Sequence, residues 1–189
     1  MEEEKQLELR MYFFVPYNIS EIAKAIQAGH SALEYADKYG SDEQFIKFVR
    51  EWKTWIILDG GTTNERRDFD SIAMGSLNQI GDSLLENDIQ FSYFKEPDLN
   101  DALTALCFIC DERVFNKEDY PDFVDYILNI KMYPNAKEET PVENIVMLKT
   151  QTLEHLQEMF PEYYKEWVRF VGGLKNVFLR ELLKDKKLA

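Results

Sequence analysis

The sequence predicts an α/β protein with a four-stranded mixed sheet, helices on the faces of that sheet, and a C-terminal helical extension. Short apolar runs typical of strands alternate with helical patterns over the first part of the chain, and helical spacing dominates beyond it. A chain of 189 residues, 45% of them hydrophobic, is long enough for one packed domain with an appendage. We therefore expect a sheet domain at 1–116 and a hairpin of helices at 117–189.

The first strand and two helices are expected before residue 53. Met11–Tyr17 is apolar throughout and predicts a strand buried on both faces. A helix over Ile22–Tyr39 follows, with Ser20 in its starting signal, and a second helix covers Glu43–Trp52. On a helical wheel, the stripe expected to face the core contains Ile22, Ala25, Ile26, Gly29, Leu33 and Ala36. Lys24 points away from this stripe and is expected in solvent.

The rest of the sheet domain alternates again between apolar runs and turn residues. Residues 59–71 are polar and predict a turn and a loop. The other elements are a strand at Lys53–Leu58, a helix from residue 71 or 76 to Asn87, a strand at Ile89–Lys95, and a strand at Leu103–Cys110. The last of these is apolar on both faces, so we expect it to be a central strand. If strands one and two are parallel, we expect a right-handed crossover between them.

The extension contains amphipathic segments. Asp122–Lys131 predicts a helix, and Tyr133–Pro141 is a polar linker with two prolines. Val142–Phe160 and Glu162–Lys184 each have an apolar stripe, and Pro161 separates them. This pair predicts a helical hairpin that packs on the sheet domain or on a second subunit. We expect the extension to bind a protein partner or to join two copies in a homodimer.

Charge and cysteine content limit the partners and the chemistry. The net charge of −13 repels polyanions and counts against nucleic acid as the main partner, with only Arg66-Arg67 and Lys184–Lys187 as local basic patches. Cys107 and Cys110, three residues apart on a strand, face opposite sides, so we expect two reduced core cysteines, no metal site and no cofactor. Neither a signal sequence nor an apolar run of about 18 residues is present, which predicts a cytoplasmic protein without a membrane partner.

His30 lies about 40° beyond the edge of the apolar stripe, where it is either a half-buried structural histidine or a site residue. The order of elements around it resembles that of the class 2 peptidyl-tRNA hydrolase fold family. The residues that align with the family's Gln-Cys-Ser-His-Ala stretch are Gln27, Ala28, Gly29, His30 and Ala32. Ala23 stands at the family's lysine position, and Lys24 is one residue late. The resemblance covers Arg10 to Val114.

This resemblance implies hydrolysis of the ester that joins a peptide to the terminal ribose of a transfer RNA. His30 matches the family histidine, and Thr104 is similar to the threonine that begins the family's last strand. The family's acidic loop is rebuilt here, so the carboxylate beside the histidine would come from Glu96, Asp98 or Asp101. Either Glu96 or Asp98 would then complete a catalytic group with His30, although Asp98 could instead cap its own turn.

Substrate binding would fall to two further groups. Gln27 and Lys24 lie on the same helix as His30. Gly60, Gly61 and Thr62 follow a strand and could present backbone N–H groups to an anion, although a plain turn has the same composition.

Two functions remain open on this evidence. The first is a non-catalytic, acidic, protein-binding relative of the family. We favour it because the family's lysine and acidic loop are altered in this chain. The chain also resembles uncharacterised proteins of phage-type genomes. The alternative is an active ester hydrolase that acts on peptidyl-tRNA with His30 and a nearby carboxylate. Transfer RNA is a partner only in that case.

Overall fold

A computed structural model describes residues 6–63, 66–68, 71–73, 75–128 and 148–189. The chain forms two compact units. The first, the sheet unit, comprises the chain up to Glu112 together with Leu182–Ala189, and the second, the helical unit, comprises Arg113–Glu181. The last eight residues belong to the sheet unit, a placement that the sequence did not indicate.

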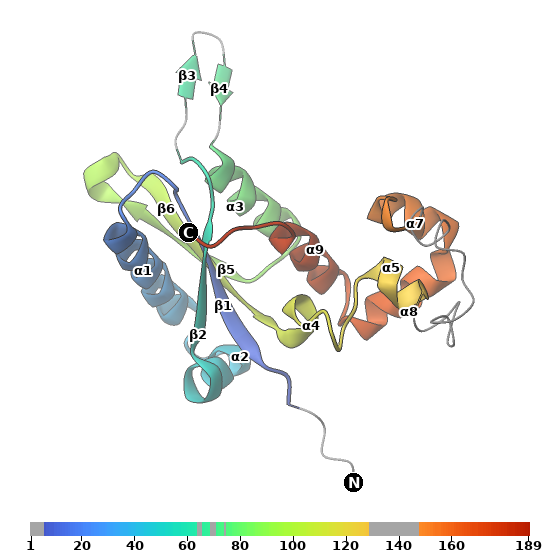
Figure 1. The fold of residues 1–189 in the computed structure, drawn as a ribbon. Helices are drawn as coiled ribbons and strands as arrows, with labels where there is room; N and C mark the ends of the chain where they lie inside the picture. The colour runs from blue at the N-terminus through green and yellow to red at the C-terminus, as the bar shows by residue number, and fades with distance from the viewer. Residues whose placement is uncertain (1–5, 64–65, 69–70, 74, 129–147) are drawn as a thin grey trace. The chain divides into compact units, whose positions relative to one another are not determined.

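The sheet unit is built on four strands, as predicted (Figure 1). They are β1 (Leu9–Val15), β2 (Thr54–Asp59), β5 (Phe91–Glu96) and β6 (Ala102–Asp111), in the order β2-β1-β6-β5. β1 and β2 are parallel, whereas β6 runs antiparallel to both of its neighbours. β1 and β6 are the inner strands and are buried on both faces, which explains their continuous apolar sequences.

Helices cover the faces of this sheet. α1 (Glu21–Tyr39) packs on β5 and β6, and α3 (Ser76–Glu86) packs on β6. Alternate residues of the strands point to the two sides. Met11, Phe13, Val15, Ala105, Cys107 and Ile109 form a core cluster with Ala28 and Tyr35 of α1. Between β1 and β2, α2 (Glu43–Lys47) continues into the π-helical turn η1 (Phe48–Trp52), so a helix does occupy Glu43–Trp52 as predicted.

Residues 59–71, predicted to form a turn and a polar loop, are partly strand. β3 (Arg66–Asp68) and β4 (Ser71–Ala73) pair antiparallel as a small separate sheet. Backbone pairing needs no apolar pattern, which is why the sequence did not indicate it.

The last residues of the chain pair with the outer edge of β2. The N–H of Asp59 donates to the carbonyl of Lys187 at 3.0 Å, and the N–H of Ala189 donates to the carbonyl of Ile57 at 3.0 Å. Leu58 and Leu188 form the antiparallel bridge between these bonds. The edge of β2 that faces away from β1 is therefore partly paired.

The helical unit contains short helices around an aromatic core. Its described helices are α5 (Phe123–Tyr126), α7 (Leu153–Met159), α8 (Pro161–Phe170) and α9 (Leu174–Leu183), and α4 (Glu112–Phe115) lies at its start. The helix predicted over Glu162–Lys184 is in fact two, because Gly172 and Gly173 take positive φ angles of 89° and 107°. The predicted linker Tyr133–Pro141 and the first six residues of the predicted helix Val142–Phe160 lie outside the described residues. In the described part of that range a turn at Thr150 and Gln151 interrupts the helix, and α7 begins after its cap at Thr152.

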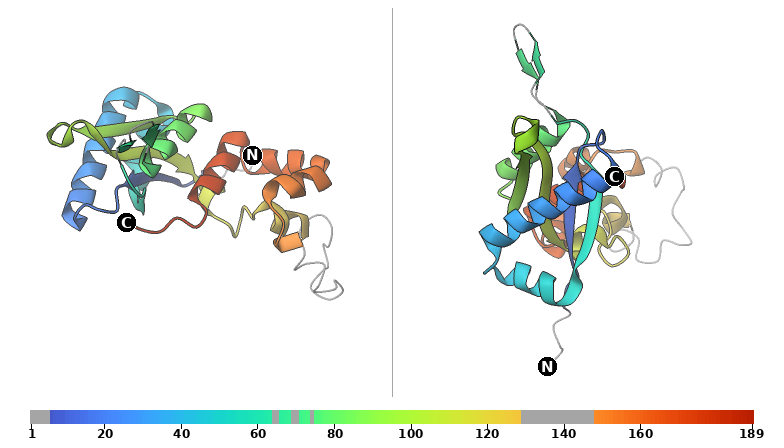
Figure 2. Two further views of the ribbon diagram at one scale, coloured as in Figure 1. Left: turned by 90° about the horizontal axis from the view of Figure 1, so that it is seen from above. Right: turned by 90° about the vertical axis from the view of Figure 1, so that its left-hand side faces the viewer.

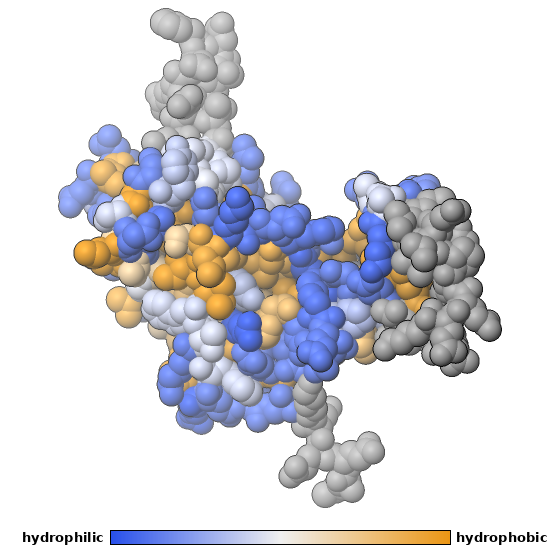
Figure 3. All heavy atoms as spheres, in the orientation of Figure 1, coloured by the Kyte–Doolittle hydropathy of each residue, from blue (hydrophilic) through white to orange (hydrophobic). Residues whose placement is uncertain are grey.

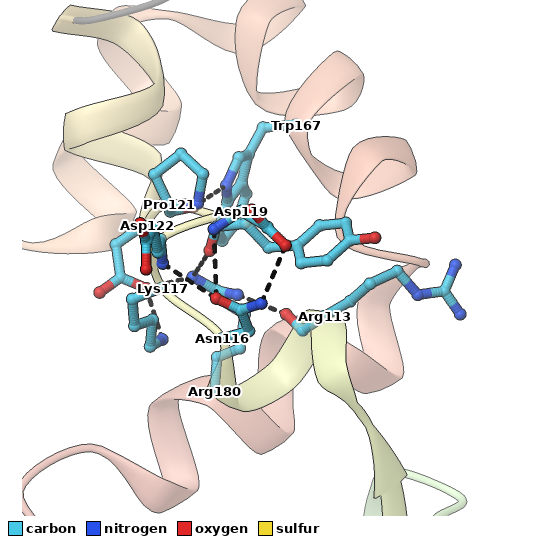
Figure 4. Close-up of polar contacts among 10 residues, drawn as sticks. Arg113, Asn116, Lys117, Asp119, Pro121, Asp122, Trp167 and Arg180 are labelled. Carbon is cyan, nitrogen blue, oxygen red and sulfur yellow. Dashed lines mark hydrogen bonds and ion pairs between the residues drawn. The ribbon is translucent and has the colours of Figure 1, made fainter. Parts of the chain in front are cut away.

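A buried arginine organises the polar contacts of the helical unit (Figure 4). Arg180 is 2% exposed, and its guanidinium donates to the carbonyls of Arg113 and Tyr120 and to the carboxylate of Asp122. Burial alone would raise the pKa of the Asp122 carboxyl, but the hydrogen bond and charge of Lys117, together with Arg180, hold that pKa below its ordinary value. Asp122 therefore stays ionised and pairs with the buried guanidinium.

Candidate functional site

The face of α1 that packs on the sheet is polar as well as apolar. Its buried residues are Lys24, Gln27, Ala28, Ser31 and Tyr35. The predicted core stripe was therefore wrong, since Ile22, Ile26 and Leu33 are 75%, 50% and 70% exposed. The prediction that Lys24 is in solvent was wrong for the same reason, because Lys24 lies opposite that stripe and is only 9% exposed.

Polar groups on the strands below α1 account for this orientation. Thr104 and Cys107 of β6 lie under the helix and bond to Gln27 and Ser31. Small side chains at Ala28 and Ser31 also let the helix lie close to the sheet. A helical wheel contains no information about the strands that a helix meets, so the sequence pattern could not reveal which face is inward.

Three of the predicted site residues form a hydrogen-bonded chain. The hydroxyl of Thr104 donates to the side-chain carbonyl of Gln27 at 2.6 Å, and the amide of Gln27 donates to the carboxylate of Glu96 at 2.7 Å. Gln27 comes from α1, Glu96 from the end of β5 and Thr104 from the start of β6. We call these residues the Gln27 chain. It brings a carboxylate, an amide and a hydroxyl together at one end of the sheet.

Lys24 lies one turn before Gln27 on the same buried face. Its ammonium is 2.9 Å from the carboxylate of Glu21, and its side chain is 11% exposed whereas that of Glu21 is 79% exposed. The ammonium of Lys24 is therefore held in the N-terminal part of α1, close in sequence to Gln27, by the exposed carboxylate of Glu21. An ion pair of this kind adds little to stability.

His30 occupies the flank of α1 and is partly buried. Its ring centroid lies 4.4 Å from that of Phe94 at an interplanar angle of 53°. The buried Nδ1 atom has no hydrogen-bond partner among the described residues. The structure does not join His30 to Glu96, whose carboxylate accepts from Gln27 instead.

Asp98 is not part of the Gln27 chain. It is exposed in a short 3-10 helix, η2 (Pro97–Leu99), that begins directly after β5. Asn100 and Asp101 follow with positive φ angles of 55° and 57°, and Asp101 is also exposed. Of the three carboxylates considered, the structure therefore brings only Glu96 to the residues expected around it.

The turn formed by Gly60, Gly61 and Thr62 uses its own backbone N–H groups. These donate to the carbonyl of Val15 at 2.8 Å, to the carboxylate of Asp59 at 2.7 Å and to the hydroxyl of Ser76 at 2.9 Å. All three are engaged within the protein. This arrangement fits a structural turn and not the anion-binding loop that the glycines allowed.

A cavity of about 480 Å³ lies beside this turn. Its lining includes Asp59, Gly60, Gly61, Ser76, Lys186 and Lys187. The two lysines reach it because the last residues of the chain pair with β2. Sequence reasoning connected neither Ser76 nor these lysines with the turn, since only that pairing brings them together.

A larger groove of about 650 Å³ lies between α1, η1 and β2. Hydrophobic side chains dominate its lining, chiefly Met11, Ile26, Leu33, Phe48, Val49 and Trp55. In Figure 3, hydrophobic atoms gather on this part of the surface, where Figure 1 places α1 and β2. The groove could not be expected from the sequence, because the helical pattern places Ile26 and Leu33 on the face predicted to meet the core.

The two cysteines are free and buried, as predicted. The thiol of Cys107 donates to the carbonyl of Ser31 at 3.1 Å, and burial raises its pKa to about 12. Burial also raises the pKa of Cys110. Neither thiol is a nucleophile at neutral pH. Among the described residues, no group of three or more His, Cys, Asp or Glu side chains could hold a metal ion.

No model of a known protein family and no curated protein sequence matches this chain. Within the described ranges, no helix is long and apolar enough to span a bilayer. The resemblance to the class 2 peptidyl-tRNA hydrolase fold family therefore has no support besides Gln27, His30 and the order of the elements.

Proposed function

We propose that the protein is a non-catalytic relative of the class 2 peptidyl-tRNA hydrolase fold family that acts by binding another protein. The observation that carries this proposal is the hydrogen bond from Gln27 to Glu96. It engages the carboxylate that the histidine of an active site would use as its partner.

A catalytic histidine needs a group that orients it and a proton that it can reach. The ring of His30 packs on Phe94, and its Nδ1 atom has no partner among the described residues. The polar groups of the Gln27 chain bond to one another. These contacts favour a structural role for the residues that resemble the family's site.

The groove beside α1 favours the binding role. Apolar patches of this kind on a protein surface commonly mark sites of interaction with other proteins. Ile26, Leu33 and Trp55, which line it, remain 50%, 70% and 44% exposed. We accordingly assign partner binding to this groove of the sheet unit, and not to the helical extension that the sequence suggested.

One observation favours the alternative, an ester hydrolase acting on peptidyl-tRNA. Lys24, Gln27, Glu96 and Thr104 lie at one end of the sheet, where strands leave it and where folds of this class often bind ligands. Catalytic hydrogen bonds can also tighten only when the substrate is bound. In this alternative, transfer RNA is the substrate.

A release assay decides between the two functions. The full chain is incubated with a peptidyl-tRNA that carries a labelled peptide, alongside His30→Ala and Glu96→Gln. We expect release at the rate of the buffer blank for all three proteins. His155→Ala is the matched control, since His155 is the other histidine of the chain and is exposed on α7. Release that is fast in the natural chain and in His155→Ala, but lost in the other two variants, would overturn the proposal.

A further inference from the structure

The outer edge of β2 is only partly covered by the end of the chain. A single antiparallel bridge joins Leu188 to Leu58, with one backbone hydrogen bond on either side of it. In the right-hand view of Figure 2, the end of the chain accordingly lies beside β2. We call residues 186–189 the C-terminal tail.

Beyond the tail, the edge of β2 is open. The N–H of Asp59 and the carbonyl of Ile57 bond to the tail, and alternate residues of a strand point their backbone groups the same way, so those of Trp55 also point outward. Among the described residues, no backbone group pairs with the N–H of Ile57 or with the N–H and carbonyl of Trp55. These three groups can pair with another strand.

A strand that continued past the tail would reach the groove beside α1. Ile57 and Ala189 lie across from each other and both pack on the core cluster beneath α1. Two residues further on, a side chain opposite Trp55 would point to this same side of the sheet. Trp55 lines the groove of about 650 Å³, whose other lining residues are mostly apolar, with His30 and Lys53 as the polar ones. The groove can therefore accept an apolar side chain at that position.

The C-terminal tail shows which residues the other end of this edge accepts. Its sequence is Lys-Lys-Leu-Ala. Lys187 lies across from Asp59, and both lysines of the tail line the cavity that Asp59 also lines. Opposite charges that face each other across antiparallel strands are favourable. The net charge of −13 also attracts a basic segment at long range.

We propose that the edge of β2 binds an extended segment of another protein, which displaces the C-terminal tail and adds an antiparallel strand to the sheet. The segment has basic residues next to Asp59 and apolar residues opposite Ile57 and Trp55. The inference rests on the proposed binding role and states the chemistry of the partner. In strand addition, backbone hydrogen bonds supply affinity and alternate side chains supply specificity.

The tail is held by few contacts and can be displaced. Two backbone hydrogen bonds of 3.0 Å join it to β2, the side chain of Leu188 is 76% exposed, and the ammonium of Lys186 lies 5.7 Å from the ring centroid of Phe14. A partner strand that reaches Trp55 replaces these contacts and pairs three further backbone groups. The tail competes with that strand, so it lowers the apparent affinity of the natural chain for its partner.

Fluorescence anisotropy of the full chain with a labelled peptide tests the inference. The probe is Lys-Lys-Leu-Ala-Thr-Leu, which repeats the tail and adds an apolar residue opposite Trp55. Ala189→Pro removes the N–H that donates to Ile57, so it should tighten peptide binding by about fivefold. Leu188→Pro is the matched control, because the N–H of Leu188 points away from β2, and it should change the dissociation constant by less than about twofold.

Variants of the peptide test its chemistry. Glutamate in place of the last leucine should weaken binding by at least about tenfold, because it places a charge beside the apolar groove. Glutamate in place of the threonine adds the same charge on the other side of the strand and should weaken binding by less than about threefold. Added salt should weaken the binding of the original peptide, because salt screens the attraction between its lysines and the acidic chain.

Hydrogen exchange followed by NMR tests where the peptide binds. The N–H groups of Trp55 and Ile57 should exchange at least about tenfold more slowly when the peptide is present, because they then pair with it. The N–H groups of Ile56 and Leu58 point towards β1 and serve as the internal control, since their exchange should not change.

Four results would overturn the inference. The first three are the absence of peptide binding in both the natural chain and Ala189→Pro, equal affinities in the natural chain, Ala189→Pro and Leu188→Pro, and unchanged exchange at Trp55 and Ile57. The fourth is a natural chain that sediments as a dimer while Ala189→Pro sediments as a monomer, because the tail of a second copy would then be the occupant. None of these results changes the outcome of the release assay, so the non-catalytic proposal and the strand addition can fail separately.

Discussion

The two faces of α1 differ from those of an ordinary surface helix, because polar side chains are buried on one face and large apolar ones are exposed on the other. The inward face buries Lys24, Gln27 and Ser31, whereas the outward face exposes Ile22 and Leu33. Most surface helices turn their apolar stripe to the core. The difference teaches that an apolar stripe on a helix does not by itself identify the face that packs on the core of the same chain.

Burial of the polar face is tolerable because its groups are bonded. Gln27 uses both its carbonyl and its amide, and the hydroxyl of Ser31 donates to the carbonyl of Ala28 at 3.0 Å. A buried polar group costs little when its hydrogen bonds are made and several times more when they are not. The following predictions test this contrast, beginning with the largest expected effect.

Introducing a glutamate should have very different effects on stability on the two faces of α1. Ser31→Glu places an unpaired carboxylate at a position with no exposed surface and should lower the free energy of unfolding by about 4 kcal/mol. Leu33→Glu, two residues on, should change it by less than about 0.5 kcal/mol. Urea unfolding of the two variants and the natural chain measures both values. Similar losses for the two variants would contradict the observed orientation of α1.

Removal of the central residue of the Gln27 chain should be the next largest effect. Gln27→Leu removes the donor to the Glu96 carboxylate and leaves the Thr104 hydroxyl with only its longer contact, 3.4 Å, to the carbonyl of Phe94, so it should cost about 2 to 3 kcal/mol. Thr104→Val should restore part of that loss when it is combined with Gln27→Leu, because both ends of the buried bond are then apolar. A double-mutant cycle of unfolding free energies gives the coupling, and strict additivity would show that the bond contributes nothing.

Alkaline pH should weaken the inward packing. Burial raises the pKa of Cys107 to about 12 and also raises that of Tyr35. Each group keeps its proton in the folded chain and loses it in the unfolded chain at its ordinary pKa, so stability is complete below about pH 8 and falls above it. We expect a loss of about 2 kcal/mol from Cys107 between pH 8 and pH 10. Cys107→Ala should reduce the slope of stability against pH over this range, whereas an unchanged slope would exclude the thiol as its source.

The smallest effect concerns the outward face. Gly29→Ala should raise the free energy of unfolding by about 0.5 to 1 kcal/mol, because alanine favours the helix and its methyl group meets no atom within 4 Å. Thermal unfolding at low protein concentration provides the measurement. A destabilised variant would mean that Gly29 is needed by the folded chain itself.

Much of the fold could be predicted because strands and helix starts are local signals. The apolar runs at β1 and β6 correctly indicated inner strands, and Ser20 marked the start of α1, where its hydroxyl accepts from the N–H of Ala23. The pairing of Leu188 with Leu58 could not be predicted, because backbone pairing between distant segments leaves no pattern in the sequence.

The candidate site was less predictable. Gln27, Glu96 and Thr104 were selected by resemblance, and the structure joins them, but their arrangement depends on which face of α1 is inward. Asp98 looked equivalent to Glu96 in the sequence. Only the 3-10 turn that begins at Pro97 separates the two carboxylates.

The pairing of Lys187 and Ala189 with β2 has a consequence for biosynthesis. While the ribosome is still making the helical unit, the outer edge of β2 has no such cover and offers free amides and carbonyls to neighbouring nascent chains. That hazard ends only when residues 187–189 leave the exit tunnel. A chain stalled before that point should therefore be the form most prone to aggregate in the cell.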